Sequence, residues 1–285
     1  AVTYSIDFSD TAGNAGNTVS TGSGSVTFDN TAPSVTISSS AISSGTTSNI
    51  DPLPLTFTVT EATANLVASN ISTTNCTLNT LATTDNITFT TDLDPAGNDI
   101  LCTVQVPAGI FTDLAGNPNV VSDAFTWTYD GSAPTMTIST NDVTLGEKSN
   151  TNSISVTFTS GETTSNFEVG DISTTNGTIS NFAGTGTTYT ATFTPENDGL
   201  CKIYVENGKF TDAAGNTNTA SNIFAWTFDS TPPIMVITSS SVNDGGFSNK
   251  SSILLLFTSD ETITDFTIDD ISVSNGTLSN FSASG

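Results

Sequence analysis

Hydrophobic and polar residues alternate along most of this chain, so that every second side chain within short runs is apolar. Residues 154–158, 189–193 and 201–205 all follow this pattern. A period of two places the apolar side chains on one face of a β-strand, whereas an amphipathic helix needs a period near 3.6. β-Branched and aromatic residues dominate the runs, and clusters of Gly, Asn, Asp or Pro separate them. The pattern predicts an all-β protein.

Repeated motifs divide the chain into units of about 100 residues. The segment Phe111–Asn117, which reads FTDLAGN, has counterparts at Phe8–Asn14 and Phe210–Asn216. Trp127 and Trp226 each lie within an aromatic alternation at the same place in a unit. Self-similarity at a fixed period indicates a repeat architecture. The predicted units are 1–31, the C-terminal part of one repeat; 32–131 and 132–230, hereafter the first and second full repeats; and 231–285, the N-terminal part of another.

The runs within one repeat predict its fold. In the second full repeat we expect seven strands, at residues 135–139, 153–159, 166–173, 177–182, 188–194, 200–206 and 222–228. Seven short antiparallel strands in about 100 residues are typical of an immunoglobulin-like β-sandwich. The disulfide and tryptophan signature of antibody domains is absent, so the prediction rests on strand number and repeat length. The fold class is therefore expected to be tandem Ig-like β-sandwich domains.

Several motifs together resemble a known family. They are the pattern FTDxAGNxN, then F-x-W-T-[YF]-D, then a Pro-led strand of the PTMTI type, and a stretch at 171–182 that recurs at 270–281. This combination resembles the tandem bacterial-type Ig-like repeats of giant surface adhesins, and it covers the whole chain. The resemblance implies an extracellular or cell-surface location. It also implies a repetitive stalk or fibre that calcium usually stiffens.

The charge balance excludes several classes of function. The 285 residues contain 28 Asp and Glu, only 4 Lys and Arg, and no His, for a formal net charge of -24. Without His, a Ser-His-Asp triad or a His-ligated zinc site cannot form. So few cations cannot neutralise a nucleic-acid backbone, and they give no attraction to an anionic bilayer. We expect neither nucleic acid nor direct membrane insertion.

The acidic residues recur at equivalent places in successive repeats. If seven strands alternate in direction, the loops after the second and sixth strands both return to the pole where the chain enters. In the second full repeat these loops carry Glu162 and the Asp212–Asn216 turn, and the preceding linker carries Asp130. The expected metal ligands are Asp29, Glu61, Asp113 and Asn117 in one group; Asp130, Glu162, Asp212 and Asn216 in the next; and Asp229 and Glu261 in the third.

Calcium is the expected cofactor. The loop after the fifth strand lies at the opposite pole, so carboxylates from neighbouring repeats should meet at each joint. This loop is expected to carry Asp92, Asp94 and Asp99 in one repeat, and Glu196 and Asp198 in the next. Calcium takes six to eight oxygen ligands and accepts irregular geometry. The alternative stays open at each single position, because Asp and Asn before Gly are ordinary turn residues and could simply close a hairpin.

Three cysteines occupy informative positions. Cys102 and Cys201 are equivalent, whereas Cys76 takes the place of Gly177. We expect a Cys76–Cys102 disulfide between the two sheets, closing a loop of about 27 residues that would contribute roughly 3 kcal/mol. Cys201 is expected to be a buried thiol, with an intermolecular link as the alternative.

The sequence therefore predicts a structural or adhesive segment of an extracellular fibre, stalk or filament, with calcium-stiffened joints. Its partners would be neighbouring repeats or identical subunits. The alternative is a carbohydrate- or protein-binding module that acts through loops at one pole. An enzyme is not expected, because the acids recur with the domain period whereas a catalytic pair occurs once. The partial repeats at both ends indicate a window on a longer chain or, alternatively, subunits that exchange strands.

Overall fold

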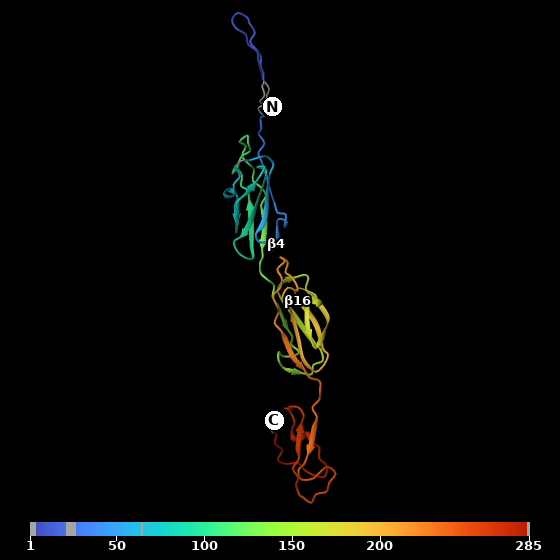
Figure 1. The fold of residues 1–285 in the computed structure, drawn as a ribbon. Helices are drawn as coiled ribbons and strands as arrows, with labels where there is room; N and C mark the ends of the chain where they lie inside the picture. The colour runs from blue at the N-terminus through green and yellow to red at the C-terminus, as the bar shows by residue number, and fades with distance from the viewer. Residues whose placement is uncertain (1–3, 21–26, 64, 284–285) are drawn as a thin grey trace.

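The computed structural model describes residues 4–20, 27–63 and 65–283. Parts of the first and last predicted units, at 1–3, 21–26 and 284–285, lie outside these residues. The chain forms an elongated array, with the two full repeats stacked end to end and the partial repeats beyond them (Figure 1). Within the described residues, no helix is long and apolar enough to cross a membrane.

The first full repeat is a two-sheet sandwich. One sheet has the order β3-β5-β9-β7, with the short β8 also on β9, and the other has the order β4-β11-β10-β6. The strands are β3 (Val35–Ser38), β4 (Thr46–Ser48), β5 (Leu53–Val59), β6 (Ser72–Thr74), β7 (Cys76–Leu78), β8 (Ala82–Thr83), β9 (Thr88–Pro95), β10 (Ile100–Gln105) and β11 (Phe125–Tyr129), with a 3₁₀ turn η1 (Ala68–Asn70) before β6.

The second full repeat has the same plan. Its sheets are β12-β14-β16 and β13-β18-β17-β15. The elements are β12 (Met136–Ser139), β13 (Lys148–Ser149), β14 (Ile154–Thr164), η2 (Val169–Asp171), β15 (Ile172–Thr175), β16 (Gly177–Pro195), β17 (Gly199–Val205) and β18 (Phe224–Phe228). The prediction of tandem Ig-like sandwiches is confirmed in both repeats.

Three details differ from the sequence prediction. Residues 166–173 are not one strand, because a 3₁₀ turn at Val169–Asp171 precedes β15. Residues 177–182 and 188–194 belong to the single strand β16. The sheets are also not wholly antiparallel, since β4 pairs with β11 and β13 with β18 in parallel. Two- or three-residue parallel strands are too short to produce a recognisable alternation.

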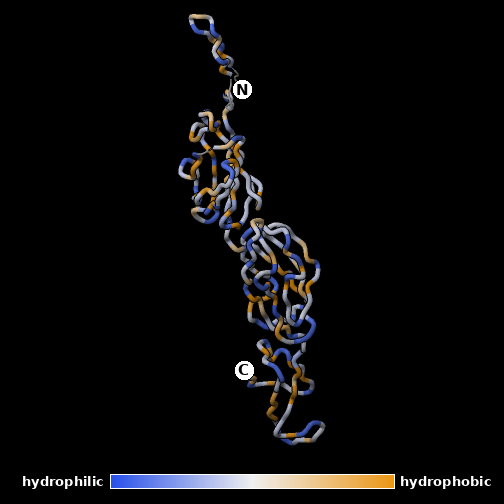
Figure 2. The backbone as a smooth tube through the Cα atoms, turned by 45° about the horizontal axis from the view of Figure 1, so that its top comes forward, coloured by the Kyte–Doolittle hydropathy of each residue, from blue (hydrophilic) through white to orange (hydrophobic). Residues whose placement is uncertain are grey.

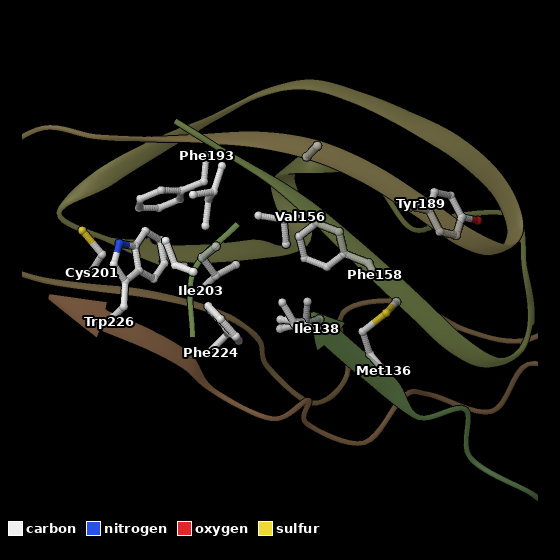
Figure 3. Packing of buried hydrophobic residues seen from close by; sticks show 14 of the residues in the cluster. Met136, Ile138, Val156, Phe158, Tyr189, Phe193, Cys201, Ile203, Phe224 and Trp226 are labelled. Carbon is white, nitrogen blue, oxygen red and sulfur yellow. The ribbon is translucent and has the colours of Figure 1, made fainter. Parts of the chain in front are cut away.

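Each repeat has its own hydrophobic core between its sheets. In the second full repeat, Phe193 and Trp226 come from opposite sheets and pack edge to face with ring centroids 5.0 Å apart (Figure 3). Trp127 holds the corresponding place in the first full repeat and is also fully buried. Hydrophobic and hydrophilic stretches alternate along the backbone of both full repeats (Figure 2).

The hydrophobic side chains of the partial repeats are more exposed than those of the full repeats. The N-terminal part has the hairpin of β1 (Ser5–Ile6) and β2 (Val19–Ser20). The C-terminal part has β19 (Met235–Thr238), β20 (Leu256–Ser259) and η3 (Ile268–Asp270). Ile237 is 59% exposed, whereas its counterpart Ile138 is 2% exposed because a second sheet covers it.

The cysteine pair lies across the sandwich of the first full repeat. Cys76 begins β7 in one sheet, and Cys102 lies on β10 in the other. Both are buried free thiols, and Sγ of Cys102 lies 3.3 Å from the backbone oxygen of Asn75, the residue before Cys76. Burial raises the pKa of Cys76, and burial together with the neighbouring thiol raises the pKa of Cys102 to about 12. Cys201 is buried as well. The disulfide itself stays a prediction.

The second full repeat cannot accommodate the same pair. A Cβ on Gly177 would overlap the ring of Phe193. Leu93 is the counterpart of Phe193 in the first full repeat, since Leu93 pairs with Leu53 in the same register in which Phe193 pairs with Ile154. The smaller side chain of Leu93 leaves room for a side chain at position 76. The two repeats therefore fill the same space in different ways.

We expect oxidation by a protein or small-molecule disulfide to link Cys76 and Cys102. Reduction should then lower the melting temperature of the first full repeat by about 10 °C or more, because the link restricts the unfolded chain. Calorimetry with and without reductant measures this change, with Cys76→Ala as the control that removes it. Free thiols at both positions after non-reducing alkylation of the oxidised protein would contradict the prediction.

Candidate metal centres at the domain joints

The Asp-x-Ala-Gly-Asn turns hold their aspartates in a fixed orientation. Oδ1 of Asp212 accepts hydrogen bonds from the backbone N–H groups of Ala214, Gly215 and Asn216, at 2.7–2.9 Å. The Gly allows the turn, since its φ is +98°. The turn at Asp10 forms the same Oδ1 contacts to residues 12 and 14. These hydrogen bonds come from the turn's own backbone, so the turn also agrees with the alternative that its Asp and Asn simply close a hairpin.

One carboxylate oxygen of each linker aspartate accepts a hydrogen bond from a backbone N–H group within the linker. Oδ1 of Asp29 accepts the N–H of Thr31 at 3.0 Å, and Oδ1 of Asp130 accepts the N–H of Ser132 at 3.0 Å. These are Asx turns, which cap the start of the linker. The arrangement leaves Oδ2 of each linker aspartate available to another partner.

A single β-bridge brings the glutamate loop to the turn. Thr164, two residues after Glu162, pairs with Asp212, and Thr63 pairs with Asp113 in the first full repeat. Both threonines are almost completely buried. Because the bridge fixes the register between the two loops, the glutamate is held beside the aspartate of the turn.

The structure brings together two of the predicted trios. In each trio, one carboxylate oxygen from every member lies within 4.8 Å of the others, and the two trios are Asp29, Glu61 and Asp113, and Asp130, Glu162 and Asp212. A cation with oxygen ligands would fit between such carboxylates. Metal binding at these positions stays a prediction.

The two asparagines have a different contact from the one expected. Nδ2 of Asn216 donates to Oδ2 of Asp212 and to the backbone oxygen of Asp130, both at 2.9 Å. Asn117 makes the corresponding contacts to Asp113 and Asp29, at 2.8 and 3.3 Å. In the structure each amide nitrogen therefore ties the linker to the turn.

The second joint contains groups from both full repeats. Asp99, from the first full repeat, lines one pocket with Asp130, Glu162 and Asp212. Of the three acids expected in the loop after the fifth strand, the structure places Asp99 at the joint, whereas Asp92 and Asp94 belong to strand β9 itself. Asp99 adopts φ +54°, a left-handed conformation that Asp tolerates better than most residues.

Direct hydrogen bonds hold this joint together, and they come from residues that the sequence analysis did not single out. The N–H of Asn49 donates to the backbone oxygen of Ala214 at 3.2 Å. Asn98 accepts the N–H of Gly131 in the linker. Ala214 is buried, whereas its counterpart Ala115 is exposed. No sequence motif marks these contacts, because they depend on how two repeats stack.

The clustered carboxylates perturb one another. Partial burial raises the pKa of Glu162, and the nearby charges of Asp130 and Asp212 raise it further. Burial, Asp29 and Asp113 raise the pKa of Glu61 in the same way. Without a cation, the folded repeat therefore holds like charges together at a cost in free energy.

The bacterial Ig-like domain family matches this chain twice, over residues 29–129 and 130–227. The chain belongs to this family. The two matches lie in tandem and cover more than half of the chain, which confirms the resemblance seen in its motifs. Because both matches contain a carboxylate trio, the candidate centres belong to these bacterial Ig-like domains.

A search of solved structures finds matches that include three bacterial proteins. InvD of Yersinia pseudotuberculosis is 15% identical, with 74% of this chain and 64% of InvD covered and a TM-score of 0.33. The Escherichia coli adhesin FdeC is 15% identical, with 81% of this chain and 74% of FdeC covered and a TM-score of 0.36. Invasin, a bacterial integrin-binding protein, is 16% identical, with 79% of this chain and 47% of invasin covered and a TM-score of 0.40. The chain thus spans less than two thirds of InvD. A comparison with curated proteins finds no match.

The third pair of predicted ligands lies at the joint between the second full repeat and the partial repeat that follows it. Asp229 and Glu261 stand at the places of Asp130 and Glu162. Oδ1 of Asp229 again accepts a linker N–H, from Thr231 at 3.3 Å, but Oδ2 accepts a hydrogen bond from Lys148 at 3.1 Å. Among the described residues, no third carboxylate lies close enough to Asp229 and Glu261 to complete a trio like the other two.

We expect Glu162→Gln to raise the melting temperature of the second full repeat by about 1–5 °C in chelator, because it removes one of the repelling charges. The raised pKa of Glu162 means that its ionised form disfavours folding above that pKa. The gain should therefore shrink as the pH falls and the wild-type glutamate becomes protonated. Calorimetry of the full chain at pH 7 and pH 5 measures both effects.

Glu196→Gln is the matched control, since Glu196 is exposed and lies at the opposite pole of the same repeat. It should change the melting temperature little. An equal gain in both variants would show that net charge, and not the cluster, is responsible.

Proposed function

We propose that this chain is a segment of a bacterial surface stalk or adhesin whose Ig-like domains act as a spacer. In this proposal, calcium bound at the joints stiffens the array, and the protein works without catalysis. The supporting observation is the second joint, where Asp99 of the first full repeat lines a pocket with Asp130 of the linker and with Glu162 and Asp212 of the second full repeat. A cation bound there would connect two domains that otherwise share few contacts.

The chemistry of this joint favours calcium over other metals. The pocket offers carboxylates, and the described residues of the chain contain no histidine and no exposed cysteine near it. Oxygen ligands of this kind suit Ca²⁺ or Mg²⁺, and Ca²⁺ accepts the irregular, protein-rich coordination that loops from two domains provide. Magnesium needs a more regular octahedron and keeps more of its water.

Stiffness is the property that such joints would control. Successive repeats contact each other through a few hydrogen bonds, such as that from Asn49 to Ala214. Small interfaces of this type leave relative domain motion as the default. Metal binding that requires ligands from both repeats would favour one orientation, and the length and reach of the stalk would then depend on the cation.

The same contacts argue against a binding module that acts through pole loops within the array. At the second joint, the loops at facing poles already touch the neighbouring repeat. Loops covered in this way cannot also present a flat or concave surface to a glycan or protein. Ligand binding in such a stalk would then fall to other parts of the protein.

Small-angle scattering of the full chain in calcium and in chelator tests the proposal. We expect the chelated protein to have a broader distribution of dimensions, because the second joint loses its bridging cation. Asp99→Asn should weaken the response to calcium at this joint, and its positive φ suits Asn as well as Asp.

Asp92→Asn is the matched control, since Asp92 is an exposed carboxylate on β9. It should keep the calcium response of the wild-type chain. Identical scattering of the wild-type protein with calcium and with chelator would refute the proposed stiffening.

A further inference from the structure

The joint after the second full repeat differs from the one before it. Nζ of Lys148 lies 3.1 Å from Oδ2 of Asp229, and the ammonium side chain is 72% exposed. Asp229 raises the pKa of Lys148, and the charge of Glu261 adds to this effect, so both predicted acids of the third joint act on one ammonium group. Oδ2 of the linker aspartate is the oxygen that stays available at the first two joints.

The strand register identifies the counterpart of this lysine. Lys148 on β13 pairs with Thr227 on β18, and Thr47 on β4 pairs with Thr128 on β11. Thr128 and Thr227 each lie two residues before the linker aspartate. The backbone then closes in the same way, since Asp130 and Asp229 donate their N–H to Ser48 and Ser149. A lysine at position 47 would therefore reach Asp130.

A second difference points in the same direction. Asp198 is the counterpart of Asp99, but linker groups occupy both of its oxygens. Its Oδ1 accepts the N–H and the hydroxyl of Ser230 at 2.8 and 2.7 Å, and its Oδ2 accepts the hydroxyl of Thr231. These hydrogen bonds lower the pKa of Asp198. At the third joint, protein donors thus satisfy carboxylates that at the second joint face one another.

We infer that Lys148 is a specificity-determining residue that supplies an internal cation to the third joint and makes this joint less dependent on calcium than the second. The inference rests on the proposed calcium function. An ammonium group close to the carboxylates neutralises part of their charge and repels a divalent cation. The array would then combine joints that respond to calcium with a third joint whose acids are partly neutralised by Lys148 at any calcium concentration.

Calcium titration of the full chain by calorimetry tests this inference with reciprocal variants. Thr47→Lys should weaken calcium binding at the second joint tenfold or more, because it places a positive charge beside the bound cation. Lys148→Thr should increase the calcium bound per chain, because it removes the ammonium group from Asp229 and Glu261. Thr47 is exposed on a short edge strand, so the first change should leave the fold intact.

Two controls separate a local effect from general ones. Thr46→Lys adds the same charge on the neighbouring residue of β4, whose side chain points to the other face of the strand. Thr47→Gln adds length without charge. Both should bind calcium as the wild-type chain does, and circular dichroism should show the same β content in all variants.

The outcomes distinguish the two proposals. Calcium binding at the second joint that is weakened only in Thr47→Lys, together with more calcium bound per chain in Lys148→Thr, would support the inference. Wild-type binding that neither variant changes would overturn it and leave the calcium function intact. Absence of calcium binding in the wild-type chain would overturn both.

Discussion

The packing of two sheets against each other in each full repeat positions the acidic groups at its joints. Once alternate apolar residues meet in the core, the loops at each pole are fixed in space. Trp226 and Phe193 lock this arrangement in the second full repeat. In the partial C-terminal repeat, Ile237 is 59% exposed, whereas its counterpart Ile138 lies under the opposing sheet and is 2% exposed. The acidic joints are a consequence of this core.

At each joint the fold holds carboxylates in fixed positions and also brings their like charges close together. The DxAGN turn holds Asp212 with three backbone N–H groups, and it does so before any cation arrives. Such preorganisation lowers the entropy cost of binding a cation. It also forces like charges together, and burial and neighbouring charges accordingly raise the pKa of Glu162. A site that is slightly unfavourable when empty and favourable when filled would couple joint stiffness to the cation concentration.

The sequence was sufficient for the parts of the structure that follow from local periodicity and repetition. Alternation predicted the strands, and recurrence of Asp130, Glu162 and Asp212 at fixed places predicted that they would converge. Features that depend on contacts between segments could not be predicted in this way. The parallel strands β4 and β13 are too short to carry a pattern, and the hydrogen bond from Asn49 to Ala214 depends on how two separate domains stack.

Repetition itself hides the differences that matter for function. A family pattern treats the joints as equivalent, because the aspartates, glutamates and turns recur. The positions between the motifs are free to vary, and there Thr47 corresponds to Lys148, and Gly177 corresponds to Cys76. One change places a cation beside an acidic pair, and the other places two thiols across a core. In a quasi-one-dimensional array each joint depends mainly on its nearest neighbours. Single substitutions can therefore set the properties of one joint or one domain without disturbing the rest. In the proposed stalk, they would let segments of the same fold respond differently to the same solution.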